Sequence, residues 1–509
     1  MAVNLNTTPH MHRRSVLKTL GATLVSPSIV KASTPLSTKP NFVFISIDDL
    51  NDWVSPLSSS EGVGSGYPGV ITPNLQYMAD VGVNCKAAYA PVPACSPSRT
   101  STLLGISPDK TGVYFNGQEW SKNAVPGAQS IFSHFRENQF KTYGLGKLFH
   151  RSTALQEKEF DCFHKVSNVS CAKNALKYDY ARRDNHGMPK AAKLEFGVQS
   201  GNCHWSNKLD ELNAIQAVKV IDEQFSGGGC FLGLGLIAPH APFAAMPDIY
   251  KKYLAKNIGQ PPGFFPNSEG ISGNLRDLRD LSDYAKNQGV KREFLRELDD
   301  AAYIQLVISY LSTITYADSV IGLVMDKLRS LNILEQTYIV VWSDHGMHMA
   351  EKLSFSKFTL WERSLRVPLL FSGPGIRPSE ILSPVSLTDI YPTLCDLAKI
   401  DTPHWCTGTS LANSIIGGDK PEKTHAVSIY GRGASNVPDD QRLSRRIATE
   451  QWNYIHHPDG SKELYDRLSD PHEWYNLYKN KGDNADIEYI IASLDSQLPQ
   501  LSECHEPVW

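Results

Sequence analysis

The sequence has no surplus of either charge, because 50 Lys and Arg residues oppose 53 Asp and Glu residues and leave a net charge of -3. A near-neutral chain offers no basic field for nucleic acid and no polybasic patch for a membrane surface. An anionic ligand must therefore be held by a local site. Internal repeats and low-complexity tracts are also absent, which excludes repeat architectures and favours ordinary globular domains.

The sequence has few long hydrophobic runs. Beyond the N-terminal segment, we expect no apolar run that approaches the ~20 residues needed to span a bilayer. The first residues differ: Arg13 and Arg14 precede a modest apolar stretch, and small residues follow near Ala32. This order is typical of a twin-arginine export signal over residues 1–32, although an amphipathic helix is the alternative. We expect export through the twin-arginine machinery to the periplasm or beyond, without a stable membrane anchor.

Cysteine is sparse, with nine residues in 509. Short spacings make Cys162 with Cys171, and Cys395 with Cys406, candidate disulfides in an oxidising compartment, but each cysteine is equally compatible with a buried thiol. Cys95 stands apart because it lies in "APVPACSPSRTSTLLG", among small residues at an apparent turn-to-helix transition.

Three apolar, strand-like segments end in polar residues. They are "NFVFISIDDL" (41–50), "GCFLGLGLIAPHAPF" (229–243) and "TYIVVWSDHG" (337–346). Helical periodicity separates them, notably over 213–225 and 308–331. The alternation predicts an α/β fold whose mostly parallel sheet is sandwiched by helices, with ligands bound beyond the carboxyl ends of the strands.

The pattern changes after about residue 415 to short alternating segments, "HAVSIYG", "RRIATEQWNYIHH" and "KELYDRLSD". Such segments predict a small antiparallel sheet. We therefore expect a catalytic domain over 33–415 and a smaller C-terminal subdomain over 416–509, with loops at 58–70 and 256–275.

Carboxylates follow two of the predicted strands, namely Asp48 with Asp49, and Asp344. A lone Asp-Asp pair is usually a cap or a turn. Three carboxylates brought together would repel one another unless a hard cation neutralised them, which favours Ca²⁺ or Mg²⁺. Zinc prefers more nitrogen or sulfur ligands.

Five cationic or titratable side chains are further candidates: Arg99, Lys147, His150, His240 and Lys357. Singly, each is more typical of a surface or structural residue. Gathered beside a metal, they would suit a tetrahedral oxyanion during S–O or P–O cleavage. Arg99 lies one helical turn after Cys95, so we expect it to share that face and to bind the anion through two hydrogen bonds.

"CSPSR" at 95–99 resembles the C-x-P-S-R signature of the formylglycine-dependent sulfatases, with "LLG" at its tail. The resemblance continues, in the order that family has them, through "IDDLNDW", "TPNLQYMADVGV", "GKLFH", "APHAPF", "SDHGMHMAEKLSFSKFTLWERSLRVPLL" and "ELYDRLSDPHEWYNL". It covers nearly all of the chain after the signal. The Asp-His pair of the second metal motif is most similar to the iduronate sulfatase-like branch.

The resemblance implies an alkaline-phosphatase-like fold, with a large mixed, mostly parallel sheet and a smaller C-terminal antiparallel subdomain. It implies that a separate formylglycine-generating enzyme oxidises Cys95 to 3-oxoalanine (formylglycine) before folding. One hydroxyl of the aldehyde hydrate then attacks sulfur to form a covalent sulfoenzyme, and the second hydroxyl collapses to release sulfate.

The resemblance also implies a role for each site residue. The metal positions are Asp48, Asp49, Asp344 and His345, with the modified Cys95 also facing the metal and His345 either a ligand or just outside the ligand shell. Arg99 and Lys147 match residues that hold and activate the formylglycine, and His150 matches one that assists its deprotonation or the collapse. His240 and Lys357 match positions that bind sulfate and protonate the leaving oxygen, and either one can be the acid.

Two positions depart from the family pattern. Leu104 replaces the usual Thr before the final Gly of the signature, and Lys352 stands where some members of the branch have His. We therefore leave Lys352 out of the predicted site.

We expect a sulfatase that hydrolyses sulfate esters on a carbohydrate, of carrageenan, ulvan or fucoidan type by analogy alone. One alternative is a phosphoester or phosphonate hydrolase on the same scaffold. Another is a non-catalytic protein that binds sulfated glycans through an unmodified thiol.

Overall fold

The computed structural model describes residues 39–58, 66–67, 69–116, 118, 125–150, 157–165, 196–197, 205–241, 243–244, 246–256, 258–259, 295, 300–431 and 442–501. Its largest sheet has eight strands in the order β14-β2-β13-β9-β1-β7-β4-β5. Their bounds are β14 Ser379–Ile381, β2 Val83–Cys85, β13 Leu369–Ser372, β9 Thr337–Ser343, β1 Asn41–Ile47, β7 Cys230–Leu236, β4 Lys141–Gly146 and β5 Cys162–His164.

The three strands predicted from polar-ended segments are neighbours at the centre of this sheet. Strand β1 pairs in parallel with β7 on one side and with β9 on the other. Strand β13 runs antiparallel to both β9 and β2, whereas β4 is parallel to β7 and β5. The expected mixed, mostly parallel sheet is confirmed, and the polar ends of β9, β1 and β7 meet at one edge.

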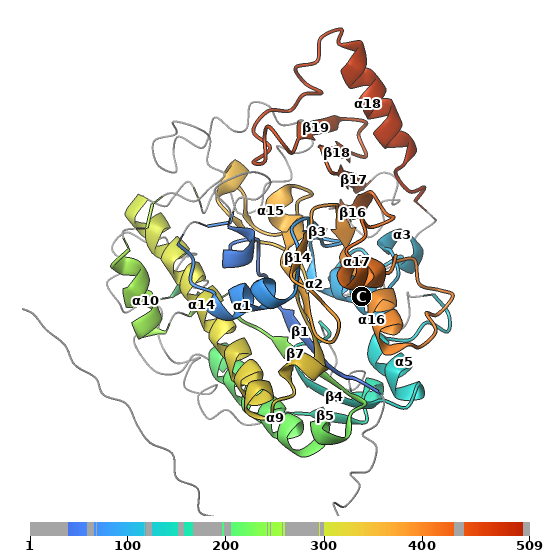
Figure 1. Cartoon of the computed structure of the whole chain (residues 1–509). Helices are drawn as coiled ribbons and strands as arrows, with labels where there is room; N and C mark the ends of the chain where they lie inside the picture. Colours follow the sequence, from blue (N-terminus) through green and yellow to red (C-terminus); the bar gives the residue numbers. More distant parts are fainter. Residues whose placement is uncertain are drawn as a thin grey trace, which may run out of the picture. The chain divides into compact units, whose positions relative to one another are not determined.

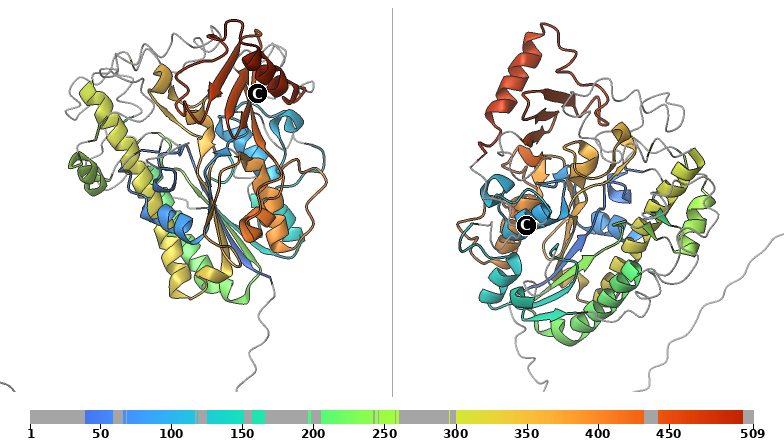
Figure 2. Two further views of the ribbon diagram at one scale, coloured as in Figure 1. Left: turned by 45° about the horizontal axis from the view of Figure 1, so that its top comes forward. Right: turned by 180° about the vertical axis from the view of Figure 1, so that it is seen from behind.

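Helices cover both faces of the sheet, because successive side chains of a buried strand point to opposite sides. On β1, Val43, Ile45 and Ile47 pack into one apolar cluster with residues of α1, α9 and α14, whereas Phe42 and Phe44 pack into another with α5 and α16. Figures 1 and 2 show these two helical layers on either side of the sheet. The helices are α1 Pro73–Val81, α2 Cys95–Leu104, α3 Pro108–Thr111, α5 Ile131–Glu137, α9 Trp205–Gln224, α10 Pro247–Leu254, α14 Asp300–Ser330, α15 Glu362–Leu365, α16 Ile390–Ala398, α17 Ala412–Gly417 and α18 Ala485–Ser496.

Helix α14 corrects the expectation that no apolar run beyond the N-terminus reaches membrane-spanning length. Its segment Tyr303–Ser330 passes that test by length and hydropathy. However, 89% of the apolar window is buried inside the protein, where it packs on α9. A helix that is hydrophobic on most sides is expected in the core of a large domain.

The predicted C-terminal antiparallel sheet is present in the order β16-β17-β18-β19. Its strands are β16 His425–Gly431, β17 Leu443–Thr449, β18 Trp452–His456 and β19 Lys462–Asp466. Side chains from one face, such as Ile447, Tyr454 and Leu464, pack against Ile491 and Leu494 of α18. Short strands complete the fold: β3 Ala88–Tyr89, β6 Phe196–Gly197, β8 Phe243–Ala244, β10 His348–Met349, β11 Phe355–Ser356, β12 Arg366–Val367 and β15 Val385–Ser386.

The candidate disulfides have different outcomes. Cys395 and Cys406 are both free thiols, so their predicted pairing is wrong in this structure; Cys395 is buried and Cys406 is partly buried. Burial raises the pKa of both thiols, which makes them poor nucleophiles. Cys162 is free as well, while Cys171 lies outside the described residues, as do the predicted export signal over 1–32 and most of the loop predicted over 256–275.

Candidate active site

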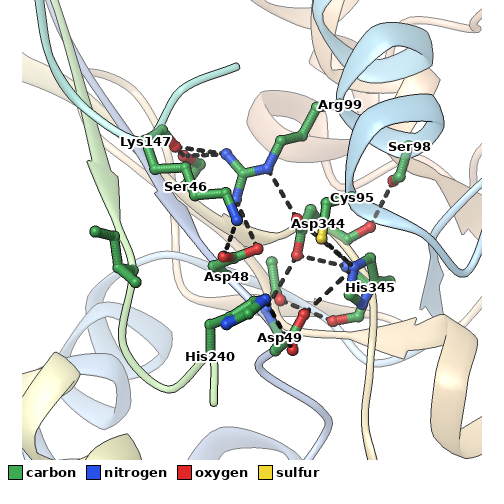
Figure 3. Close-up of polar contacts among 12 residues, drawn as sticks. Ser46, Asp48, Asp49, Cys95, Ser98, Arg99, Lys147, His240, Asp344 and His345 are labelled. Carbon is green, nitrogen blue, oxygen red and sulfur yellow. Dashed lines mark hydrogen bonds and ion pairs between the residues drawn. The ribbon is translucent and has the colours of Figure 1, made fainter. Parts of the chain in front are cut away.

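The polar residues that end the three central strands converge as predicted. Asp48 and Asp49 follow β1, Asp344 and His345 follow β9, and His240 lies four residues beyond β7. Figure 3 shows these side chains pointing toward one another and toward Cys95. Asp48, Asp344 and His345 have no exposed surface, so the group is removed from bulk water.

The backbone at Asp49 adopts a conformation that non-glycine residues seldom use, with φ of 61°. Contacts from other elements hold it. The hydroxyl of Tyr310, on α14, donates a hydrogen bond to the Asp49 carbonyl at 2.7 Å, and the amide of Leu50 donates to Ser343 Oγ at 3.1 Å. Such strained backbone persists only where its surroundings fix it, often at functional sites. Neither Tyr310 nor Ser343 was predicted from the sequence.

Cys95 is the first residue of α2, which agrees with the predicted turn-to-helix transition. Its side chain is buried, with 1% of the residue exposed. Lys357 Nζ lies 3.0 Å from Cys95 Sγ, and His345 Nε2 lies 3.2 Å from it. Lys357 Nζ also donates to Asp49 Oδ1 at 2.5 Å. A thiol, a lysine, a histidine and a carboxylate are therefore in mutual contact.

Arg99 lies one turn along α2 from Cys95, but the structure corrects its expected role as a bidentate anion binder. Its Nε donates to Asp344 Oδ2 at 2.8 Å, and Nη1 donates to the carbonyls of Lys147 at 2.6 Å and Leu148 at 3.0 Å. Nη2 faces Asp48 Oδ1 at 3.4 Å. Arg99 therefore joins three strand ends through protein acceptors, which orders the site around Cys95.

Lys147 directly follows β4 and forms an ion pair with Asp48. The backbone of Lys147 lies close to β7, and this requires glycine at position 235. A Cβ on Gly235 would lie 2.1 Å from the Lys147 carbonyl group, where no side chain fits. Burial alone would lower the pKa of Lys147, but attraction to Asp48 raises it. This lysine therefore carries a positive charge at neutral pH.

Both carboxylates after β1 are ionised. Burial alone would raise the pKa of Asp48, but attraction to Lys147, His240 and Arg99 lowers it well below its usual range. Burial opposes ionisation of Asp49 as well, yet His240 and Lys357 lower its pKa to about 2. Two negative charges thus persist in a buried place, as a divalent cation site requires.

Four residues offer ligand atoms that lie within 4.8 Å of one another and could hold a metal ion: Asp48, Asp49, Cys95 and His345. The Nδ1 of His345 faces the Gly346 carbonyl at 3.0 Å, which only accepts, so Nε2 is the nitrogen that points into the group. Burial would lower the pKa of His345, but Asp344 and Cys95 raise it to about 9, and a bound cation would displace that proton. This donor set fits a divalent metal.

Asp344 lies beside this group rather than within it. Its Oδ1 accepts hydrogen bonds from the amides of Asp49 at 3.1 Å and His345 at 3.0 Å, and its Oδ2 pairs with Arg99. Asp344 therefore fixes the backbone that carries two of the candidate ligands, and its own role as a ligand stays a prediction.

The remaining predicted histidines line the same place. Burial, with help from the charge of Lys147, lowers the pKa of His150 to about 4, so it is neutral near pH 7 and able to accept a proton. Its Nδ1 is buried with no hydrogen-bond partner among the described residues. His240 is 35% exposed at its side chain, and its Nε2 lies 3.8 Å from Asp49 Oδ2. The otherwise buried group is therefore exposed to solvent at His240.

Lys352, which we left out of the site, lies elsewhere. Its Nζ donates to the Glu473 carbonyl and lies 4.7 Å from the ring centre of Tyr465, between the loop that follows β10 and the C-terminal sheet. It occupies a structural position five residues before Lys357.

Comparison with known proteins agrees with this geometry. Residues 40–400 match the sequence model of the Sulfatase family, and residues 350–503 match the C-terminal model of N-sulphoglucosamine sulphohydrolase. A "Sulfatase" of Formosa agariphila is 27% identical over 90% of this chain and 86% of its own length. An "Ulvan-active sulfatase" of the same organism is 26% identical over 92% and 82%. The solved phosphonate monoester hydrolase of Agrobacterium radiobacter superposes with a TM-score of 0.70 at 18% identity, over 90% of this chain and 94% of that one, which confirms the alkaline-phosphatase-like fold class.

Proposed function

The chain belongs to the sulfatase family and is a sulfuric ester hydrolase, and from this premise we propose that it removes sulfate from carbohydrates by way of an oxidised Cys95. The observation that carries the proposal is the buried contact of Cys95 with Lys357 and His345, beside Asp49. An ordinary structural cysteine has no need of two cationic partners. We propose that Cys95 is converted to formylglycine, which would supply the hydrated aldehyde that accepts the sulfuryl group.

The metal-holding residues in this proposal are Asp48, Asp49, His345 and residue 95, with Asp344 as a further candidate. We propose Ca²⁺, with Mg²⁺ as the alternative, because oxygen donors and negative charge prevail. A bound divalent cation would supply charge that acidifies the hydroxyl of residue 95 and neutralises the sulfate oxygens.

The other side chains divide the remaining tasks. Arg99 and Lys147 hold Asp344 and Asp48 in place and keep positive charge beside residue 95. His150, neutral near pH 7, can take a proton. Lys357 is positioned for the anionic ester oxygens, and the part-exposed His240 is positioned for the leaving oxygen, although either one can serve as the acid.

A sulfated carbohydrate is the substrate class that we propose. An "Ulvan-active sulfatase" matches 92% of this chain at 26% identity, which supports a glycan substrate. Ulvan, carrageenan and fucoidan fragments are the substrates to test first, and membership of the iduronate sulfatase-like branch stays a prediction. The likeness to a phosphonate hydrolase shows the fold alone.

We also propose a maturation step and an export step. Cys95 is 1% exposed in the folded chain, so a formylglycine-generating enzyme must reach it before folding. Twin-arginine export of the folded protein to the periplasm, or secretion beyond it, would then follow that oxidation.

The experiment is release of free sulfate from a panel of defined sulfated oligosaccharides, using protein whose aldehyde at residue 95 has been confirmed by peptide mass spectrometry. Cys95→Ala is the control, because it removes the modifiable sulfur while leaving a small buried side chain. We expect sulfate release that the control abolishes. An aryl sulfate and the matching aryl phosphate are assayed in parallel.

Each outcome decides between the alternatives. Faster turnover of the phosphate would favour the phosphoester hydrolase. An unmodified thiol in protein from the native host, together with silence on every ester, would favour a non-catalytic glycan-binding protein.

A further inference from the structure

Asp210 is a fully buried carboxylate on α9 to which the sequence gives no role. Its Oδ1 accepts a hydrogen bond from the amide of Ile237 at 2.9 Å, and its Oδ2 accepts from the amide of Ala238 at 2.8 Å. These two amides directly follow β7, and α9 packs against that strand. Asp210 therefore accepts hydrogen bonds from the backbone at the point where the chain leaves β7. Figure 1 shows α9 and β7, the two elements that this contact joins.

The segment held in this way leads directly to His240. The amide of His240 donates to the Ile237 carbonyl at 2.8 Å, so Ile237 is held through its N–H by Asp210 and through its C=O by the turn. The His240 ring continues the chain of contacts, because its Nδ1 donates to the Ala241 carbonyl at 2.6 Å and its Nε2 faces Asp49.

We propose that Asp210 is the positioning residue for His240, a proposal that rests on the function proposed above for that histidine. A carboxylate suits the task because two adjacent amides need acceptors in a place closed to water, and an unsatisfied buried amide is costly. Asparagine has a single oxygen, so its NH₂ group would face one of the two N–H groups. The turn would then shift, and His240 would move with it.

The structure contains a matched control for this carboxylate. Asp318, on α14, is also buried and also accepts from two consecutive amides, those of Asn74 at 3.1 Å and Leu75 at 2.8 Å. Those amides begin α1, away from β7 and His240. Asp318→Asn therefore removes the same kind of interaction without touching the turn that holds His240.

The test is a double-mutant cycle between Asp210→Asn and His240→Ala, on protein with the aldehyde at residue 95 confirmed. The probe is the sulfated oligosaccharide of the panel above that the wild type cleaves fastest, because its alkoxide leaving group needs a proton whereas the 4-nitrophenolate of an activated aryl sulfate does not. We expect Asp210→Asn to lower kcat roughly 10- to 100-fold, the scale of a catalytic group misplaced by about 1 Å. His240→Ala alone should lower kcat at least as much. The double variant should be no slower than His240→Ala, within about twofold, because the two residues act on one step.

Two results would overturn the positioning role of Asp210, and a third would overturn the role of His240 on which it rests. If the fold-loss of kcat in the double variant equals the product of the fold-losses in the two single variants, Asp210 does not act through His240. Equal losses of kcat in Asp210→Asn and Asp318→Asn would show that Asp210 contributes only to the general stability of the fold. A wild-type kcat in His240→Ala would instead refute the role proposed for His240, which separates failure of the function from failure of the positioning.

A second variant covers the case in which Asp210→Asn does not fold. Asp210→Glu keeps both oxygens but moves them by one methylene, so kcat should fall less than in the asparagine variant. The same cycle with His240→Ala then applies, and multiplicative losses would again count against the proposal.

Discussion

Lys357 Nζ lies 3.0 Å from the sulfur of Cys95 and 2.5 Å from Oδ1 of Asp49. One ammonium group thus links the residue that we propose as nucleophile to a candidate metal ligand. Burial alone would lower the pKa of Lys357, but attraction to Asp49 and Cys95 raises it well above the usual range. The lysine is fixed in its charged form.

Lys357→Ala should therefore remove a charge that stabilises the anionic ester. We expect kcat/KM for an aryl sulfate to fall at least about 100-fold. Lys357→Arg should recover little, because a planar guanidinium does not replace a compact ammonium in a closed pocket. Retention of more than a tenth of the wild-type kcat/KM by the alanine variant would contradict the role. Lys86→Ala is the control, because Lys86 is a largely buried lysine outside the site that pairs with Glu380 at 3.3 Å.

Arg99 should govern stability as well as activity. Its removal leaves the buried Asp344 and Asp48 without their shared partner, and breaking a buried pair in this way typically costs about 3–5 kcal/mol. We expect Arg99→Ala to lower the unfolding midpoint strongly. Arg329 also pairs with a carboxylate, Asp326, at 2.6 Å, but at the surface. Arg329→Ala should leave that midpoint almost unchanged, and equal effects of the two variants would be evidence against a buried network.

Metal binding should be visible without any assay of activity. Added Ca²⁺ should raise the unfolding temperature of chelator-treated protein in a concentration-dependent way, by mass action on the folded state. Asp48→Asn should weaken that rise. If the temperature is the same with and without Ca²⁺, and with and without Mg²⁺, the assignment of a divalent cation site fails. Comparison of the two cations decides which one the site prefers.

Gly235 should be a sensitive position because of the close approach of Lys147. A methyl group there would meet the Lys147 carbonyl at 2.1 Å, so β4 and β7 must separate. We expect Gly235→Ala to cost about 1–3 kcal/mol of stability through overpacking and to lower kcat by displacing Lys147. Gly227→Ala, whose added carbon would meet nothing within 4 Å, is the control. Similar kcat values in the two variants would show that Lys147 tolerates the movement.

The stability of the protein should fall in acid through Glu463, a fully buried carboxylate. Burial alone would raise its pKa, but the hydrogen bond with His457 and the charge of that ring lower it from 4.5 to about 2. The folded state therefore binds this proton less readily than the unfolded chain. The stability that Glu463 provides is complete above pH 4.5 and is lost as pH falls toward 2, to a total of roughly 3 kcal/mol.

Urea unfolding at pH 6, 5, 4 and 3 measures this effect. Glu463→Gln should be less stable than the wild type at pH 6, and the difference should shrink as pH falls. A difference that stays constant from pH 6 to pH 3 would show that Glu463 is not ionised in the folded state.

Local sequence pattern was enough to predict the central strands and most of the site. A buried parallel strand is an apolar run, and the polar residue that ends it lies at a predictable edge of the sheet. Asp48, His240 and His345 were found in this way, and the structure brings them together. The signature "CSPSR" added roles for Cys95 and Arg99 by resemblance.

Contacts between distant segments could not be predicted in the same way. Tyr310 is an aromatic residue in an apolar helix, which is the normal pattern of a core residue, yet its hydroxyl holds the Asp49 carbonyl from 261 residues away. Arg99 was expected to bind an anion because its neighbours were unknown. Cys395 and Cys406 are close in sequence, but spacing alone does not determine whether two thiols pair.

The loop that carries Lys357 is tied to the C-terminal part of the chain, since Lys352 donates to the Glu473 carbonyl and the Glu362 amide donates to Glu473 Oε2 at 3.0 Å. Glu473 follows Cys95 by 378 residues. At about 5–20 residues per second, a ribosome needs roughly 20 to 75 seconds to make that stretch. The order of synthesis therefore gives the maturation enzyme that we propose an interval on this scale, in which Cys95 has been made but the C-terminal contacts that hold the loop of Lys357 have not yet formed.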